Sequence, residues 1–148
     1  MTTPRSTLGG SGDSGQDAAI AAAEAAIAAL AEKYVEWVRV DLTAARAAFV
    51  KAGETLPDNS EAIGEIFAVC HNIKGQGSSF GYQLMTDIGG SICDLIRDCE
   101  PAPEARLKVI EAHLAALEFV IGREIKGDGG DAGRGLVDKL KGYVDNES

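Results

Sequence analysis

The chain has 148 residues, of which 45% are apolar, and its formal net charge is −9 at pH 7. This length predicts one globular domain of ordinary size with an added tail, and the apolar fraction is enough for a core that folds alone. Because an acidic protein is repelled by phosphate backbones and by anionic lipids, nucleic acid and membrane surfaces are disfavoured as partners.

The start of the chain is rich in Gly, Ser and Thr and shows no apolar periodicity, so residues 1–16 are expected to form a disordered tail. This stretch also lacks the apolar segment of a signal peptide, and no later stretch is long and apolar enough to cross a bilayer. The expected location of the protein is therefore the cytoplasm.

A strongly helical pattern begins at Asp17, which suits a helix N-cap, and continues to Gly53, which suits a C-terminal stop. A run of this length is either one helix or two helices joined between Glu32 and Val35. Its alanine-rich part, residues 18–31, is typical of a packed or oligomerising helix. Beyond it, an apolar stripe at helical spacing is formed by Trp37, Val38, Leu42, Ala45 and Phe49.

Three further helices and a short C-terminal one are expected, because turn residues, glycines and prolines separate the apolar periods that follow. The expected ranges are residues 61–80, 82–98, 104–125 and 136–144. Amphipathic helices joined by short loops cannot bury their apolar faces alone. The predicted fold is therefore all-α, an up-down four-helix bundle with an extra N-terminal helix and a short C-terminal helical appendage. The predicted boundaries are residues 17–126 for the bundle with its N-terminal helix and residues 127–148 for a Gly-rich linker and the short helix.

Glycines and cysteines indicate how tightly the bundle packs. Gly89 and Gly90 each cost about 1 kcal/mol of helix propensity relative to alanine, and close helix–helix contact is the expected compensation. Cys70 and Cys93 stand in apolar helical company and are expected in the core, whereas Cys99, near a helix end, can be exposed. Three cysteines without CxxC spacing argue against a disulfide framework or a zinc knuckle.

The most informative stretch is residues 70–81, which read CHNIKGQGSSFG. On a helix that turns about 100° per residue, Lys74 and Gly75 fall on either side of His71, and Ser78 returns almost to its direction. The opposite side is occupied by Ile66, Val69, Cys70, Ile73, Gly77 and Phe80. His71 is therefore predicted to point outward from the bundle, beside one cation and one missing side chain.

These neighbours suit the exchange of a phosphoryl group with a large partner. An unprotonated imidazole is a competent nucleophile near neutral pH, and Lys74 can bring its ammonium near oxygens attached to the ring. Gly75 removes the Cβ that would obstruct an approaching protein. Earlier on the same helix, Gly64 and Phe67 share the outward face, so with Ser78 they are predicted to contact the partner.

The chain has no P-loop, no kinase glycine-rich loop and no evident pair of carboxylates for magnesium. The histidine must therefore receive its phosphoryl group from another protein. We expect this chain to have no ATP-dependent kinase activity, no metal site and no cofactor of its own.

Residues 71–81 resemble the HxxKGxxxxxG signature of histidine phosphotransfer (HPt) domains, which serve two-component phosphorelays. The resemblance implies a four-helix bundle in which His71 is phosphorylated on Nε2, Lys74 offsets phosphoryl charge and Gly75 gives clearance. Gly81 would mark the break after the histidine helix. The implied donor is a sensor or hybrid histidine kinase or a receiver aspartate. The implied acceptor is a response-regulator receiver, which would supply magnesium. Gln76 has no assigned role beyond a hydrogen bond to the ring or to the partner.

Two other interpretations compete with the phosphorelay. The same bundle could bind receivers as a non-transferring scaffold or phosphate sink. A metal-binding bundle could instead use His71, His113 and the cysteines, but Cys70 and His71 diverge by about 100° on one helix, which argues against it. His113 has no Gly or Lys at matching offsets and is expected to be a partly exposed structural residue.

Overall fold

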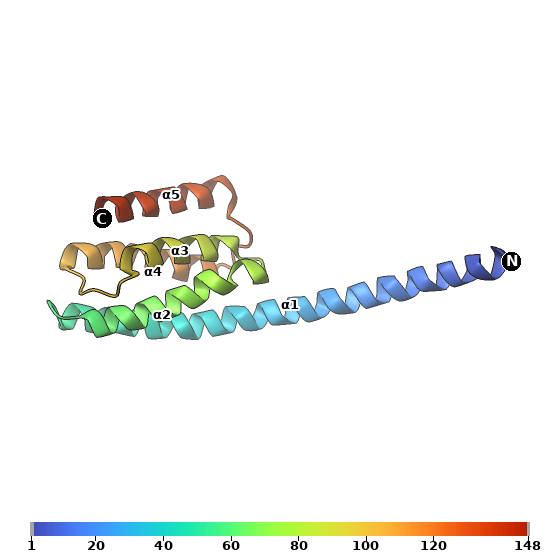
Figure 1. Ribbon diagram of the computed structural model, residues 1–148, viewed down its shortest axis with the longest axis horizontal. Helices are drawn as coiled ribbons and strands as arrows, with labels where there is room; N and C mark the ends of the chain where they lie inside the picture. Colours follow the sequence, from blue (N-terminus) through green and yellow to red (C-terminus); the bar gives the residue numbers. More distant parts are fainter. Residues whose placement is uncertain (1, 148) are drawn as a thin grey trace. The chain divides into compact units, whose positions relative to one another are not determined.

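A computed structural model describes the backbone of residues 2–147 and the side chains of residues 14–147. Over these residues every regular element is a helix, as Figure 1 shows, which confirms the all-α prediction. In chain order the elements are α1 (Thr2–Glu54), α2 (Ser60–Gln76), the 3-10 turn η1 (Ser78–Phe80), α3 (Gln83–Ile96), α4 (Glu104–Gly122) and α5 (Gly130–Glu147). None of the described helices combines the length and the apolar character needed to cross a membrane.

The N-terminal helical region is one helix rather than two, because α1 continues without interruption through Glu32 and Val35. The helix also includes residues 2–16, where the composition predicted a disordered tail. Once a strong helix former such as the alanine-rich stretch is helical, each further residue adds a hydrogen bond without a new nucleation cost. The side chains of residues 2–13 lie outside the described residues.

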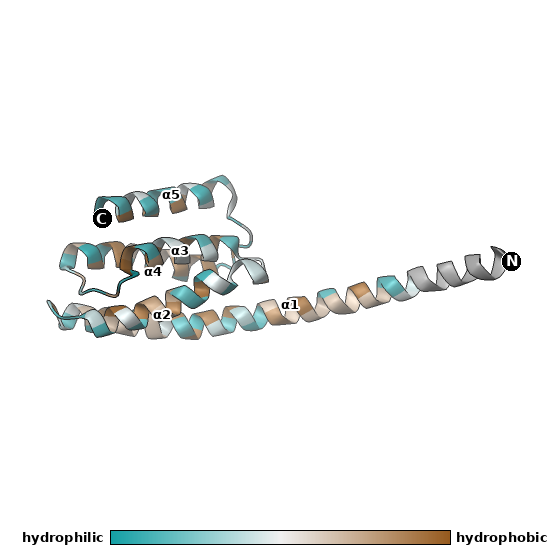
Figure 2. Ribbon diagram, viewed as in Figure 1, coloured by the Kyte–Doolittle hydropathy of each residue, from teal (hydrophilic) through white to brown (hydrophobic). Residues whose placement is uncertain are grey.

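The chain divides into two compact units, residues 1–33 and residues 34–148. In the first unit the described side chains up to Leu30 are exposed, and they include Ile20 and Ile27. Figure 2 shows the apolar character of this stretch of α1. The interpretation of residues 18–31 as a packed or oligomerising helix stays a prediction.

The second unit holds the core, which is built from α2, α3, α4, α5 and the part of α1 that follows Lys33. α3 is central, since it packs against α2, α4 and α5 (Figure 1). On α1, Val38, Leu42 and Ala45 are buried at helical spacing. The prediction that Trp37 belongs to this stripe is wrong: its side chain is 49% exposed, because it lies about 100° from its neighbour Val38 around the helix.

The C-terminal helix is longer than the expected range of residues 136–144 and belongs to the same packed unit. α5 contacts both α3 and α4, and Val137 and Leu140 are buried in the core. Gly133 permits the tight entry into this helix, because a Cβ at this position would clash with the carbonyl oxygen of Asp128. The chain therefore folds back onto the bundle directly after a glycine-rich turn.

Asn59, just before α2, connects three segments by hydrogen bonds at the end of the bundle where α2 begins. Its buried amide nitrogen donates to the carbonyl oxygens of Ala52 at 3.0 Å and Ala102 at 2.9 Å, and its oxygen accepts from the Ala102 backbone nitrogen at 2.8 Å. A buried amide with these bonds satisfied fixes its neighbours in one arrangement. Asn59 thus holds the start of α2 against the end of α1 and the loop before α4.

Candidate functional site

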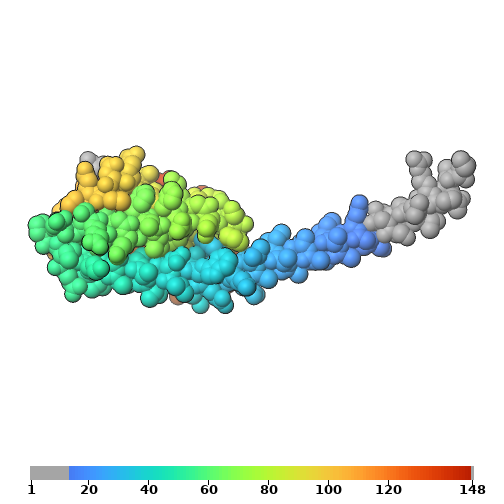
Figure 3. Space-filling view, turned by 60° about the horizontal axis from the view of Figure 1, so that its bottom comes forward, coloured from blue at the N-terminus to red at the C-terminus, as the bar shows by residue number. Residues whose placement is uncertain are grey.

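α2 presents His71 on its solvent-facing side, as the periodicity predicted. His71 and Lys74 are exposed, whereas Ile66, Cys70 and Ile73 on the opposite side are buried in the core. The buried stripe anchors the helix and leaves the histidine side open. In the space-filling view of Figure 3, α2 (green) lies along the surface beside the second-unit part of α1 (cyan).

The ring of Phe67 lies against the ring of His71. Their centroids are 5.7 Å apart and their planes differ by 19°, so the two rings are stacked. The Phe67 side chain is half-buried, and one face of its ring lies against the imidazole. The sequence placed Phe67 on the outward face but did not predict this contact, although an i, i+4 spacing is the separation at which helix side chains meet.

Packing within the described part of the fold does not require glycine at two positions on the exposed side of α2. A Cβ added at Gly64 or at Gly75 would meet no atom within 4 Å. Each glycine lowers helix propensity by about 1 kcal/mol relative to alanine, and no packing contact offsets that cost. The missing side chains leave a low surface on both sides of the histidine along the helix.

The glycine pair on α3 lies against Lys74 of α2. A Cβ at Gly89 would lie 3.0 Å from the backbone nitrogen of Lys74 and 3.2 Å from the carbonyl oxygen of Cys70. The expected close contact between helices is therefore confirmed at Gly89. A Cβ at Gly90 would lie 3.9 Å from both Cδ and Cε of Lys74, so the aliphatic part of that side chain passes beside Gly90.

The histidine helix ends a little earlier than expected, at Gln76, and η1 follows. A Cβ at Gly77 would lie 2.7 Å from Oγ1 of Thr86, and the same oxygen accepts the backbone N–H of Ser78 at 2.8 Å. Gly81 has a left-handed φ of 88°, which confirms it as the break after the helix. Gln76 and Ser78 are exposed, and among the described side chains no hydrogen bond joins Gln76 to the histidine ring.

The cysteines are free thiols, and two of them fill the core as predicted. Cys70 and Cys93 are buried, and Cys99 is half-buried. Burial raises the pKa of the Cys93 thiol to about 11, an effect that the nearby charge of Lys74 partly opposes. At this pKa the thiol stays protonated near neutral pH and is a poor nucleophile or metal ligand.

The prediction that His113 is partly exposed is wrong, because its side chain is fully buried between α4 and α3. Nδ1 lies 2.8 Å from the carbonyl oxygen of Val109, which can only accept, so Nδ1 carries the proton. Nε2 then accepts from the hydroxyl of Ser91 at 2.9 Å. Burial lowers the pKa of His113, since the charged ring would be desolvated.

The two histidines do not share a site. His71 lies on the exposed face of α2, whereas His113 is enclosed by the core. Among the residues with described side chains, no group of three or more His, Cys, Asp or Glu is placed to hold a metal ion. The competing interpretation of a metal-binding bundle therefore has no geometric support in this part of the chain.

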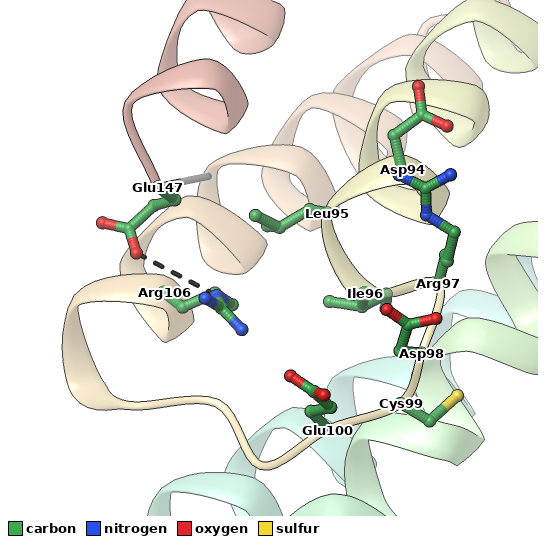
Figure 4. A pocket seen from close by; sticks show the side chains of 9 residues that line it. All are labelled: Asp94, Leu95, Ile96, Arg97, Asp98, Cys99, Glu100, Arg106 and Glu147. Carbon is green, nitrogen blue, oxygen red and sulfur yellow. Dashed lines mark ion pairs between the residues drawn. The ribbon is translucent and has the colours of Figure 1, made fainter.

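A polar cavity of about 180 Å³ lies away from the histidine, at the C-terminal end of α3 (Figure 4). Arg106 and Glu147 form an ion pair on one side of it, with Nε and Oε2 4.0 Å apart. Its lining mixes acidic and basic side chains and includes neither His71 nor Lys74. The candidate site is thus an open helix face rather than a cavity, which suits a protein partner better than a small molecule.

Comparison with protein families gives one match, to the model described as the Hpt domain, over residues 29–119. This range includes α2 and therefore His71, Lys74 and Gly75. Comparisons with curated proteins and with solved structures gave no match. Because the matched range is more than half of the chain, the chain belongs to the Hpt domain family, whose members carry phosphoryl groups in two-component phosphorelays.

Proposed function

We propose that this protein is a phosphorelay intermediate in which His71 accepts a phosphoryl group from a kinase or a receiver aspartate and passes it to the aspartate of a response-regulator receiver. The observation that carries this proposal is the exposed imidazole of α2, with Lys74 one turn further on and a bare helix surface at Gly75. Membership of the Hpt family supports the same proposed function.

The transfer step needs a neutral imidazole with its proton on Nδ1. The lone pair of Nε2 on His71 attacks the phosphorus of an aspartyl phosphate, and the bond from phosphorus to the carboxylate oxygen breaks. The aspartate leaves as a carboxylate, and the ring keeps the Nδ1 proton while it carries the phosphoryl group. The reverse of this step delivers the group to the next receiver. Stacking on Phe67 supports a fixed ring plane for in-line attack.

The remaining groups at the site have electrostatic and steric roles. The Lys74 ammonium offsets the charge of the phosphoryl oxygens, and Gly75 leaves clearance for the partner. Gly64, Phe67 and Ser78 contribute the surface on which the partner docks. For Gln76, whose side chain is exposed, the role left open is a hydrogen bond to the partner or to the histidine ring.

The chemistry that the chain lacks would come from its partners. A receiver would supply magnesium and its acidic pocket, so this chain needs no cofactor and no metal of its own, and it has no ATP-dependent kinase activity. An upstream sensor or hybrid histidine kinase and response-regulator receivers are the proposed partners, and the cytoplasm is the proposed location. Nucleic acid and membrane surfaces are not proposed as partners, given the net charge of −9.

The proposal is tested by intact-mass analysis after incubation with a phosphorylated receiver or an active hybrid kinase. We expect one acid-labile phosphoryl adduct on the wild-type protein and none on His71→Gln. That variant keeps His113, so it also tests whether the second histidine accepts the group. Receiver binding without any adduct, over a panel of donors, would contradict transfer and support the scaffold or phosphate-sink interpretation.

A further inference from the structure

The side chain of Lys74 lies along α3. Its Cδ and Cε are the atoms nearest to the site where a Cβ of Gly90 would stand, both at 3.9 Å, and among the described side chains, apart from the two neighbours of Gly90 in the chain, no other comes within 4 Å of that point. One turn further along α3, the charge of Lys74 acts on the buried thiol of Cys93 and lowers its pKa against the effect of burial. The stem of the lysine therefore runs over Gly90 of α3.

The backbone below this side chain is also fixed from α3. Gly89 allows the α2 backbone to approach closely, since its absent Cβ would stand 3.0 Å from the nitrogen and 3.2 Å from the Cα of Lys74. Gly89 is buried, whereas Gly90 is only partly buried at the surface between the two helices. The two glycines thus have separate effects: Gly89 sets the distance between the helices, and Gly90 leaves room for the lysine side chain above that contact.

We propose that Gly90 is a positioning residue for the phosphoryl-transfer site, because it provides the surface along which the Lys74 side chain lies and so sets where the ammonium stands relative to His71. The inference rests on the proposed function and adds to it a residue on a different helix. Alanine is compatible with this arrangement, since 3.9 Å is an ordinary van der Waals distance. A longer side chain would occupy the path of the lysine stem and displace its ammonium.

The position of the lysine is tested without any transfer reaction. In nuclear Overhauser spectra of the wild-type protein, we expect cross-peaks between the δ and ε protons of Lys74 and the α protons of Gly90. Gly90→Ala should keep the contact, now to the alanine methyl group, whereas Gly90→Leu should lose it or shift it. Absence of the contact in the folded wild-type protein would overturn the proposal, whatever the outcome of phosphorylation.

The consequence for chemistry is tested by transfer rates from a phosphorylated receiver to four proteins: wild type, Gly90→Leu, Lys74→Ala and the double variant. We expect Gly90→Leu and Lys74→Ala each to slow transfer by about tenfold, the factor equivalent to roughly 1.4 kcal/mol. If Gly90 acts through the lysine, the double variant is no slower than Lys74→Ala alone. Gly142→Leu, at an exposed helical glycine of α5 with nothing within 4 Å of its absent Cβ, is measured beside them as the matched control and should transfer at the wild-type rate.

Two results would overturn the positioning role while leaving the proposed function intact. One is an unchanged transfer rate in Gly90→Leu. The other is an equal slowing by Gly90→Leu when Lys74 is already alanine, which would indicate a general structural defect. If wild-type protein accepted no phosphoryl group from any donor, the proposed function would fail instead, and the spectra would still report the position of the lysine.

Discussion

At the scale of single residues, glycine serves opposite purposes on the two helices of the site. Gly89 faces a backbone at 3.0 Å, whereas a Cβ at Gly75 would meet nothing within 4 Å. The first glycine is therefore required by the fold. The second is unfavourable for the fold, and the proposed function assigns it the clearance for a partner, so the two kinds of glycine should respond differently to substitution.

Gly75→Ala should stabilise the protein and impair its activity. Alanine improves helix propensity by about 1 kcal/mol, which corresponds to a rise of about 2–4 °C in Tm for a chain of this size. The added methyl group would stand where the partner is proposed to approach, and a misplacement of about 1 Å can slow transfer by as much as about a hundredfold. Thermal unfolding and the rate of phosphoryl transfer from a receiver measure the two effects.

Gly142→Ala is the matched control for this substitution. Gly142 is also an exposed helical glycine with nothing within 4 Å of its absent Cβ, but it lies on α5. We expect the same gain in stability and an unchanged transfer rate. Equal transfer rates in Gly75→Ala and Gly142→Ala would show that the surface at Gly75 is not needed for clearance.

His113 should make the stability of the fold depend on pH. Burial lowers the pKa of this ring below its usual value of 6.5, so below that pH the unfolded chain binds a proton that the folded protein does not. Its contribution is therefore present above the unfolded pKa and is lost as the pH falls. Denaturant unfolding from about pH 7.5 to about pH 5.5 should show a free energy of unfolding that decreases with acid.

Two variants identify the group that causes the pH dependence of the free energy of unfolding. His113→Gln should be less stable than the wild type at neutral pH, because it disturbs the bonds to Ser91 and Val109, but its stability should vary less over this pH range. His71→Gln changes an exposed ring and should retain the slope. If the free energy of unfolding of His113→Gln fell with acid as steeply as that of the wild type, another group would be responsible for the pH dependence.

At the scale of elements, the sequence analysis underestimated how much α5 contributes to the core. The apolar spacing of its residues suggested a short appendage, but Val137 and Leu140 are part of the core and the helix packs on α3 and α4. Spacing shows that one face is apolar without showing what that face covers. The contact of α5 with α3, the central helix, joins it to the element that also faces Lys74.

Leu140→Ala should therefore destabilise the whole bundle. The substitution removes a side chain that is 3% exposed, and large-to-small changes of this kind cost roughly 2–5 kcal/mol. Lys139→Ala, at an exposed neighbour on the same helix, should change stability by no more than about 0.5 kcal/mol. Urea unfolding compares the two. If Leu140→Ala unfolded at the same urea concentration as the wild type, α5 would be a dispensable appendage.

At the scale of the whole molecule, the candidate site is a face of the bundle and not a cavity. The polar cavity at the end of α3 excludes the histidine, and the exposed part of α2 carries His71, Lys74 and the bare surface at Gly75. In the proposed function, a site of this kind leaves most of the catalytic groups to the partner, and specificity would depend on the docking surface around the histidine.

The sequence by itself determined those features that depend on spacing along one helix. The 3.6-residue period placed His71, Lys74 and Gly75 outward and Cys70 and Ile73 inward, and the break after the histidine helix was expected at Gly81, where the structure has a left-handed φ. The tertiary structure alone decided which helices meet. His113 is buried between α4 and α3, where the Ser91 hydroxyl is its hydrogen-bond partner, and Lys74 lies over Gly90 because α2 and α3 approach closely at Gly89. These contacts join residues far apart in the chain, and helical periodicity gives the direction of a side chain but not the neighbour that it reaches.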